Sequence, residues 1–276
     1  MSTIELPATQ YLNRSGGRVA FDDTGGGGPL IIAAPGMGDT RGSYRHVRHA
    51  LHASGTRFVT MDLRGQGDSD ATFADYTDGA VAGDYLALVE DRQAGPALLV
   101  GNSLSCAAAV IAAAERPDLV SGIVLLAPFV RPADIPQWQQ RLFAAGLAGP
   151  WGRAAWVGYY RTVLYPGAKP PDHDRHVAAV KSMLAGSGRM HAFRRLAAND
   201  HATSAERLAA VTVPAVVVMG TADPDYPDAT AEARAVAQIL GAELVLAEGS
   251  GHYPQADQPA AVVPAILGAL ASGTAS

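Results

Sequence analysis

The sequence predicts an α/β protein in which helices cover both faces of a mostly parallel central sheet, with a further helical segment inserted into the chain. Short apolar runs of strand length alternate with stretches of helix length over most of the sequence. Between residues 129 and 208 the strand-like runs stop, and prolines and large aromatic residues take their place. We therefore expect a core domain formed by residues 1–128 and 209–276, and a helical cap formed by residues 129–208.

The first two predicted strands form a hairpin, because Ser15, Gly16 and Gly17 between them favour a turn. The third, at residues 30–34, is continuously apolar, which is typical of a parallel strand buried on both faces. The predicted strands are residues 11–13, 18–22, 30–34, 58–61, 97–100, 120–126, 214–219 and 243–246. The predicted helices outside the cap are residues 44–52, 77–91, an alanine-rich stretch after Ser103, 229–240 and 258–271.

Helical patches run through residues 129–208 and are broken at Pro150, Pro166 and Pro170-Pro171. The aromatic side chains of this segment either form its own core or line an apolar pocket for a ligand, and both interpretations stay open. If they line a pocket, we expect it to be formed by Gly36, Phe129, Trp138, Trp156, Tyr159 and Tyr253.

The composition indicates a globular protein whose partner is a small-molecule substrate. Of the 276 residues 48% are hydrophobic, and the net charge of -5 argues against nucleic acid as a partner. Residues 93–114 carry no charge, but Gly95, Pro96 and the turn that follows divide them into a strand and a helix, so we expect no membrane span. Residues 1–17 lack a basic start followed by an apolar block, so we expect a cytoplasmic protein without a signal peptide. Both a monomer and a homodimer are compatible with the sequence.

The segment Gly101-Asn102-Ser103-Leu104-Ser105 follows an apolar strand and precedes the alanine-rich helix. A serine at such a turn is held on a sharp bend with its hydroxyl at the sheet edge, which is the geometry of a nucleophile elbow. A second copy of the pattern, at residues 67–71, lacks both the strand and the helix and is interpreted as a loop. Cys106, the one cysteine of the chain, excludes an internal disulfide and is expected to be a core thiol.

Polar residues also follow the last two predicted strands, Asp223 after the first of them and His252 after the second. Because the carboxyl ends of parallel strands meet at one edge of a sheet, we expect Ser103, Asp223 and His252 to lie together. Their order along the chain, Ser, Asp, His, is that of a known hydrolytic triad. Asp225 is an alternative acid two residues further on, and Asp134 is a third.

These residue types predict acyl-transfer chemistry. Ser103 would attack a carbonyl carbon, His252 would take up the serine proton and return it to the leaving group, and Asp223 would orient the imidazole. The backbone amides of Met37 and Leu104 would form an oxyanion hole. These steps need no metal and no cofactor, and none is expected.

At these residues the sequence resembles the α/β-hydrolase superfamily, over nearly its whole length outside the cap. The matching segments are Gly-Asn-Ser103-Leu-Ser, Asp62-Leu-Arg-Gly-Gln-Gly-Asp-Ser69, Gly-Thr-Ala-Asp223-Pro-Asp-Tyr-Pro and Gly-Ser-Gly-His252-Tyr-Pro. The resemblance implies the α/β-hydrolase fold and hydrolysis of a carboxylic ester or thioester. It also implies that Asp62, Arg64 and Ser69 are structural. The chain departs from the family pattern at Ser105, where glycine is usual, and at Pro35-Gly36, where relatives commonly have His-Gly.

Several other activities of this superfamily stay open: acyl transfer or cyclisation, carbon–carbon bond hydrolysis, haloperoxidase-like chemistry, and ligand sensing with little turnover. A dinucleotide-binding interpretation of Gly36, Gly38 and Gly42 is disfavoured, because their spacing is off by one and Ser103 and His252 would be left unexplained.

Two histidine-rich segments are not interpreted as metal sites. His46, His49 and His52 recur every third residue and, with Arg41, Arg45 and Arg48, are expected to form a solvated basic face of a helix. The segment Asp172-His-Asp-Arg-His176 lies among prolines and charges in the cap.

Overall fold

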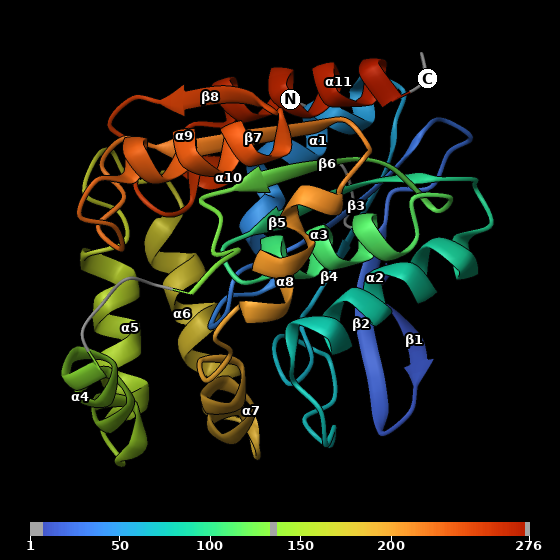
Figure 1. Ribbon diagram of the computed structural model, residues 1–276. Coiled ribbons are helices and arrows are strands. Elements are labelled where there is room, and N and C mark those ends of the chain that lie inside the picture. The colour runs from blue at the N-terminus through green and yellow to red at the C-terminus, as the bar shows by residue number, and fades with distance from the viewer. Residues whose placement is uncertain (1–7, 133–136, 274–276) are drawn as a thin grey trace.

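The computed structural model describes residues 8–132 and 137–273, arranged as shown in Figure 1. Eight strands form one sheet in the order β1-β2-β4-β3-β5-β6-β7-β8. Strand β2 is antiparallel to β1 and β4, and all the other neighbours are parallel. The strands are β1 (Gln10–Arg14), β2 (Gly17–Asp23), β3 (Leu30–Ala34), β4 (Arg57–Met61), β5 (Ala97–Asn102), β6 (Val120–Leu126), β7 (Ala215–Gly220) and β8 (Glu243–Ala247). The predicted fold class is confirmed.

Helices cover both faces of the sheet because its central strands are apolar on both sides (Figure 1). The helical elements outside the insertion are η1 (Arg41–Tyr44), α1 (Arg45–Ala53), α2 (Asp78–Arg92), α3 (Ser105–Glu115), α9 (Ala229–Leu240), α10 (Pro254–Asp257) and α11 (Pro259–Gly273). In β3, Ile31 and Ala33 belong to a buried cluster with residues of α1 and α11, whereas Leu30 and Ile32 belong to a cluster on the opposite face with residues of α2, α3 and α9.

Between β6 and β7 the chain leaves the sheet and forms a helical insertion (Figure 1). Its described elements are α4 (Gln137–Ala148), α5 (Gly152–Thr162), α6 (His173–Met183), α7 (Arg189–Leu196), α8 (Ala202–Arg207) and η2 (Leu208–Ala210). Helix α8 packs against α2 and α3, so the chain has already returned to the core before β7 begins. The domain boundaries at residues 129 and 208 stay a prediction.

The insertion has an aromatic core of its own. Trp156, Tyr160 and Phe193 are buried in one cluster, which Tyr253 joins from the loop after β8. Trp151, by contrast, is 60% exposed. For the buried members, the structure therefore supports the interpretation of the aromatic residues as internal packing.

Polar contacts connect the insertion to the loop after β3. Asp39, which is fully buried, accepts a hydrogen bond of 2.8 Å from the hydroxyl of Tyr160 on α5. Its other carboxylate oxygen lies 2.7 Å from Nε2 of His176 on α6. A further ion pair of 2.7 Å joins Arg45 on α1 to Asp172 before α6. Because buried polar groups are costly without partners, these contacts position α5 and α6 against the core.

The prediction of a solvated basic face on the first helix is largely wrong. Arg41 and Arg48 are buried and both pair with Asp22, and Arg45 is occupied by Asp172. Of the six residues expected to form this face, only His49 is exposed. Arginine stems cover apolar surface while the guanidinium pairs with carboxylates, so a basic pattern on a helix need not face water.

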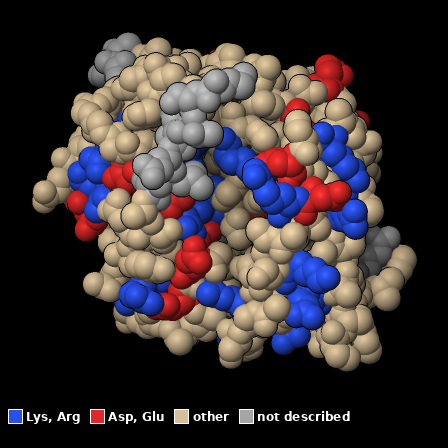
Figure 2. All heavy atoms as spheres, turned by 180° about the vertical axis from the view of Figure 1, so that it is seen from behind, with Lys and Arg blue, Asp and Glu red and all other residues tan. Residues whose placement is uncertain are grey.

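Acidic and basic side chains lie next to one another in several places on the face shown in Figure 2. Exposed ion pairs such as those of Arg116 with Asp118 and of Arg161 with Asp174 follow the same pattern. Within residues 8–132 and 137–273, no helix has the length and apolar character that crossing a membrane requires.

Candidate active site

The turn between β5 and α3 holds Ser103 in the left-handed conformation, with a φ of 57°. A residue other than glycine adopts this conformation rarely, and such strain is typical of functional turns. The amide of Ser103 donates to the carbonyl of Leu126 on β6 at 2.9 Å, and its carbonyl accepts from the amide of Cys106 at 3.0 Å. A Cβ atom at Gly101 would lie 2.6 Å from the amide of Cys106, which explains the small residue before the serine. The predicted elbow geometry is present.

Ser105 replaces the glycine that is usual after the elbow, and its hydroxyl has a structural role. It accepts a hydrogen bond from the amide of Asn102 and donates one to the carbonyl of Ala34, each at 2.8 Å. These bonds join the carboxyl ends of β5 and β3, at the edge on which Ser103 lies.

His252 and Asp223 are brought together at the same edge, and both are buried. Nδ1 of His252 lies 2.8 Å from Oδ2 of Asp223. Because a carboxylate only accepts hydrogen bonds, Nδ1 carries the proton and Nε2 is the basic nitrogen of the neutral ring. Burial alone would lower the pKa of His252, but the charges of Asp223 and Asp225 outweigh it and raise that pKa to about 9.

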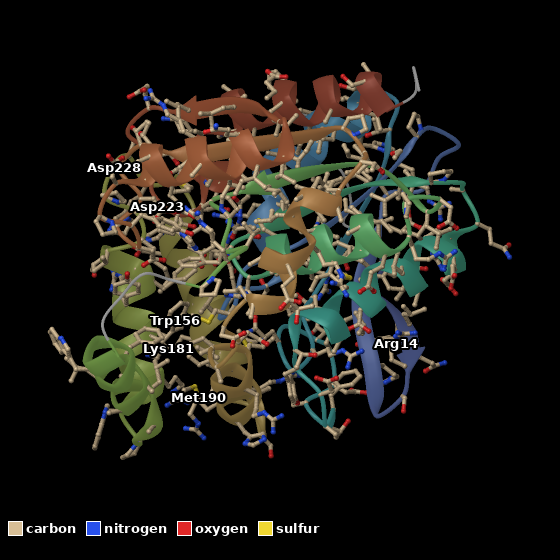
Figure 3. The ribbon with its side chains drawn as sticks, viewed as in Figure 1. Arg14, Trp156, Lys181, Met190, Asp223 and Asp228 are labelled. Carbon is tan, nitrogen blue, oxygen red and sulfur yellow. The ribbon has the colours of Figure 1, made fainter. Side chains whose placement is uncertain are left out.

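The alternative acid, Asp225, also approaches the imidazole. Its Oδ2 lies 3.5 Å from Nδ1 of His252, and its Oδ1 accepts a hydrogen bond from the hydroxyl of Tyr159 on α5. The shorter contact makes Asp223 the hydrogen-bond partner of His252. Asp134, the third acid considered, lies outside the described residues. In Figure 3, Asp223 lies further into the molecule than Asp228, which caps α9 through the amide of Ala231 at 2.8 Å.

The loop after β3, which carries the predicted oxyanion-hole residue Met37, packs against the elbow. A Cβ atom at Gly36 would lie 2.9 Å from Cβ of Ser103. The amide of Gly38 donates to Oε1 of Gln66 at 3.0 Å, and its carbonyl accepts from the indole of Trp156 at 3.1 Å. These two bonds fix the loop at the residue after Met37.

The other predicted oxyanion-hole residue, Leu104, follows Ser103 and begins the turn of α3. Within the described parts of the chain, the amides of Met37 and Leu104 have no protein acceptor. A role of these two amides as donors to a ligand oxygen stays a prediction.

Asn102 is a site residue that sequence reasoning did not single out. It is fully buried, and its Nδ2 donates to the carbonyl oxygens of Leu126 at 3.1 Å and of His252 at 3.0 Å. It thereby ties the elbow strand to the loop that carries His252. An amide in an otherwise apolar buried strand was the available signal. Cys106 is a core thiol as expected, because burial raises its pKa and leaves it protonated.

Most of the expected pocket residues lie near the candidate site. The amide of Phe129 donates to the carbonyl of Ser103 at 3.3 Å, and its ring centroid lies 5.6 Å from that of His252. The ring of Tyr253 packs edge-on against His252 at 5.3 Å. Gly36, Trp156 and Tyr159 make the contacts described above. Trp138 is not brought to this group, because its side chain is 64% exposed on α4.

The segment that the family resemblance marked as structural is a buried ion-pair network. Asp62 is fully buried, pairs with Arg41 and accepts from the amide of Asp68 at 2.9 Å. The hydroxyl of Ser69 accepts from the amide of Ala20 at 2.9 Å, so this serine braces β2.

Among the described residues, one group of carboxylates and histidine is close enough to share an ion: Asp223, Asp225 and His252, whose potential ligand atoms lie within 4.8 Å. Nδ1 of His252 is already engaged with Asp223, so we interpret the group as an acid–base cluster. The side chains of the cap segment at residues 172–176 have separate partners: Asp172 pairs with Arg45, and His176 contacts Asp39.

Comparison with known proteins gives the chain its family. A model described as the alpha/beta hydrolase family matches residues 31–265. RutD of Klebsiella pneumoniae (strain 342), named as a candidate carbamate hydrolase, is 28% identical over 71% of this chain and 74% of its own.

The fold is similar to that of a thermophilic esterase from Thermogutta terrifontis, with a TM-score of 0.78, 23% identity and coverage of 96% of this chain and 99% of the esterase. It is also similar to an enol-lactonase from Burkholderia xenovorans LB400, with a TM-score of 0.80, 21% identity and coverage of 95% and 100%. The parallel sheet, the serine turn and a family match that spans well over half of the sequence agree, and the chain belongs to the alpha/beta hydrolase family.

Proposed function

We propose that the protein hydrolyses carboxylic esters or thioesters of small to medium, apolar molecules through an acyl-enzyme on Ser103. The observation that carries the proposal is the pairing of His252 with Asp223, at 2.8 Å, on the sheet edge where Ser103 occupies its strained turn. A base that is oriented by a buried carboxylate at the same sheet edge as a serine is the arrangement that activates a serine nucleophile.

In the first half of the proposed reaction, Oγ of Ser103 attacks the carbonyl carbon of the ester while Nε2 of His252 takes its proton. Asp223 stabilises the imidazolium that forms. The carbonyl oxygen becomes an oxyanion, which accepts hydrogen bonds from the amides of Met37 and Leu104. When the carbon–oxygen bond of the ester breaks, His252 returns the proton to the departing alcohol and the acyl group stays on Ser103.

In the second half, water attacks the acyl carbon, His252 takes a proton from that water, and the serine oxygen leaves with the same proton. The acid product is released and the free hydroxyl of Ser103 is restored. Every group in both halves belongs to the chain, the substrate or water.

An apolar substrate is supported by the aromatic side chains beside the imidazole. The ring of Phe129 stacks on that of Tyr226, with centroids 5.0 Å apart, and its centroid also lies 5.6 Å from that of His252. Apolar walls with few polar groups are typical of sites for small organic ligands. We propose that the helical insertion acts as the cap of this site, since Tyr159 and Trp156 of α5 reach the loops of Asp225 and Gly38.

Carbamate hydrolysis is the second candidate, because the relative with 28% identity is named for it. The same steps apply to a carbonyl carbon that carries a nitrogen on one side.

The test compares the wild type with Ser103→Ala on p-nitrophenyl acetate, butyrate, octanoate and a p-nitrophenyl carbamate, from neutral to alkaline pH. Ser182→Ala, which removes an exposed serine of α6, is the matched control. Turnover by the wild type and the control but not by Ser103→Ala supports the proposal, and the preferred chain length reports the size of the acyl pocket. Equal turnover by Ser103→Ala would exclude Ser103 as the nucleophile.

A further inference from the structure

Two carboxylates, and not one, converge on the imidazole of His252. Asp223 and Asp225 both lie in the loop after β7, with Oδ2 atoms at 2.8 Å and 3.5 Å from the same ring nitrogen, Nδ1. One N–H group makes one well-formed hydrogen bond, and the distances assign it to Asp223. Asp225 is therefore close enough to act on the ring by charge without being its hydrogen-bond partner.

The remaining contacts of the two carboxylates hold them apart and in place. Oδ1 of Asp223 accepts a hydrogen bond of 3.0 Å from the backbone amide of Asp225. Oδ1 of Asp225 accepts from the hydroxyl of Tyr159, which reaches it from α5. The amide and the hydroxyl are neutral donors, so they do not cancel the negative charges of the two carboxylates beside the imidazole of His252.

The geometry points to Asp225 as a second, positioning carboxylate that stabilises the protonated imidazole of His252 together with Asp223, and that Tyr159 of the helical insertion holds toward the ring. This inference rests on the proposed function, in which His252 becomes protonated during each half of the reaction. An opposite charge within about 4–6 Å favours the charged form of an ionisable group, typically by 1–3 pKa units.

The other ionisable groups around His252 leave Asp223 and Asp225 as its charged neighbours. Tyr159 donates a hydrogen bond to Asp225, and the ring of Tyr253 packs against that of His252. Burial raises the pKa of each of these tyrosines above its ordinary value, so both are neutral over the range in which His252 titrates. Burial is also the main cause that raises the pKa of Asp225, whereas the charge of protonated His252 lowers that pKa.

The position of α5 then matters for the acid–base group. If α5 moves away from the sheet edge, Asp225 loses its hydrogen-bond donor and is free to turn from the ring. The Tyr159–Asp225 contact therefore connects the insertion to the acid–base group.

The test is the pKa of His252 in the folded protein, followed by NMR of ¹⁵N-labelled histidine side chains as a function of pH. This measurement does not need a substrate. The signal of His252, one of eight histidines, is assigned by its loss in His252→Gln. The variants are Asp225→Asn, which keeps an acceptor for Tyr159, and Asp225→Ser as a second replacement that keeps a small polar side chain. Asp228→Asn is the matched control, because it removes a carboxylate from the same loop whose partner is the amide of Ala231.

We expect both Asp225 variants to lower the pKa of His252 by about one unit or more, and Asp228→Asn to leave it at the wild-type value. An unchanged pKa of His252 in folded Asp225→Asn or Asp225→Ser would overturn the inference. So would an equal fall in Asp228→Asn, because the effect would then be a general one of net charge. Failure of the proposed function would be seen in a different experiment, as turnover that does not depend on Ser103.

Discussion

Nδ2 of Asn102 donates a hydrogen bond of 3.0 Å to the carbonyl oxygen of His252, although the two residues are 150 positions apart in the chain. The same amide group also donates to Leu126 on the neighbouring strand, at 3.1 Å. One side chain therefore sets the position of the His252 loop relative to the strand that ends at Ser103.

Replacing Asn102 by alanine should impair both folding and turnover. It removes the donor to the carbonyl of His252, whereas the carbonyl of Leu126 keeps its bond from the amide of Ser103. Leaving one buried carbonyl group unpaired costs about 1–3 kcal/mol of unfolding free energy. It also frees the loop of His252, so kcat for an ester should fall in the protein that remains folded. Urea unfolding and steady-state kinetics measure the two effects.

Asn199→Ala is the matched control, because Nδ2 of Asn199 also donates to two backbone carbonyls, those of Tyr76 and Leu196, at 2.9 and 3.0 Å. It should lose stability without losing kcat. If Asn102→Ala kept the wild-type kcat, the positioning role of Asn102 would be wrong.

The pH dependence of activity should follow His252. The ring must be neutral to take the proton of Ser103, and its pKa in the folded protein is about 9. We therefore expect kcat/KM to rise about tenfold per pH unit toward pH 9 and to level off above it. A neutral p-nitrophenyl ester, corrected for its spontaneous hydrolysis, gives the profile. A plateau already reached at neutral pH would contradict it.

The same group links stability to pH, with the opposite sign. The ordinary pKa of histidine is near 6.5, and the folded-state value is higher, so protonated His252 stabilises the fold. This contribution is fully present below about pH 6.5 and is lost as the pH rises through about 9. In Asp223→Asn the loss over this interval should be smaller than in the wild type, as measured by urea unfolding across the range.

Gly36→Ala should disturb the site without unfolding the protein. The added methyl group would lie 2.9 Å from Cβ of Ser103 and 3.2 Å from Oδ1 of Asn102, so the loop carrying Met37 must shift. Small displacements of catalytic groups have large effects on rate, and we expect kcat to fall on the order of tenfold or more. In Gly27→Ala, where no atom lies within 4 Å of the new methyl group, kcat should be unchanged. Equal activity of the two variants would argue against this placement of the loop.

Asp62 and Asp68 both pair with Arg41, yet their replacement should have very different effects. Asp62 is fully buried, and breaking a buried pair typically costs about 3–5 kcal/mol, so Asp62→Asn should be strongly destabilised. The side chain of Asp68 is 58% exposed, and Asp68→Asn should lose less than about 1 kcal/mol. Denaturant unfolding of the two variants compares them directly, and similar losses would contradict the burial-based account.

The sheet, the serine turn and the approach of His252 to Asp223 could be predicted from sequence because each depends on local patterns. An apolar run predicts a strand, and polar residues after parallel strands meet at one edge. The contact between Tyr159 and Asp225 could not be predicted in this way, because it depends on how α5 packs over the sheet. The same holds for the burial of Arg41 and Arg48, because it depends on their pairing with Asp22, which lies on the distant strand β2.

The central claim, that Ser103 is the nucleophile activated by His252, is tested most directly by covalent labelling with a fluorophosphonate and peptide mass spectrometry. Such a reagent reacts with an activated serine hydroxyl and leaves a stable adduct on it. We predict one adduct per chain in the wild type, located on the peptide that contains Ser103, with much slower labelling in His252→Ala and none in Ser103→Ala. An adduct on a different residue, or labelling of Ser103→Ala at the wild-type rate, would contradict the account.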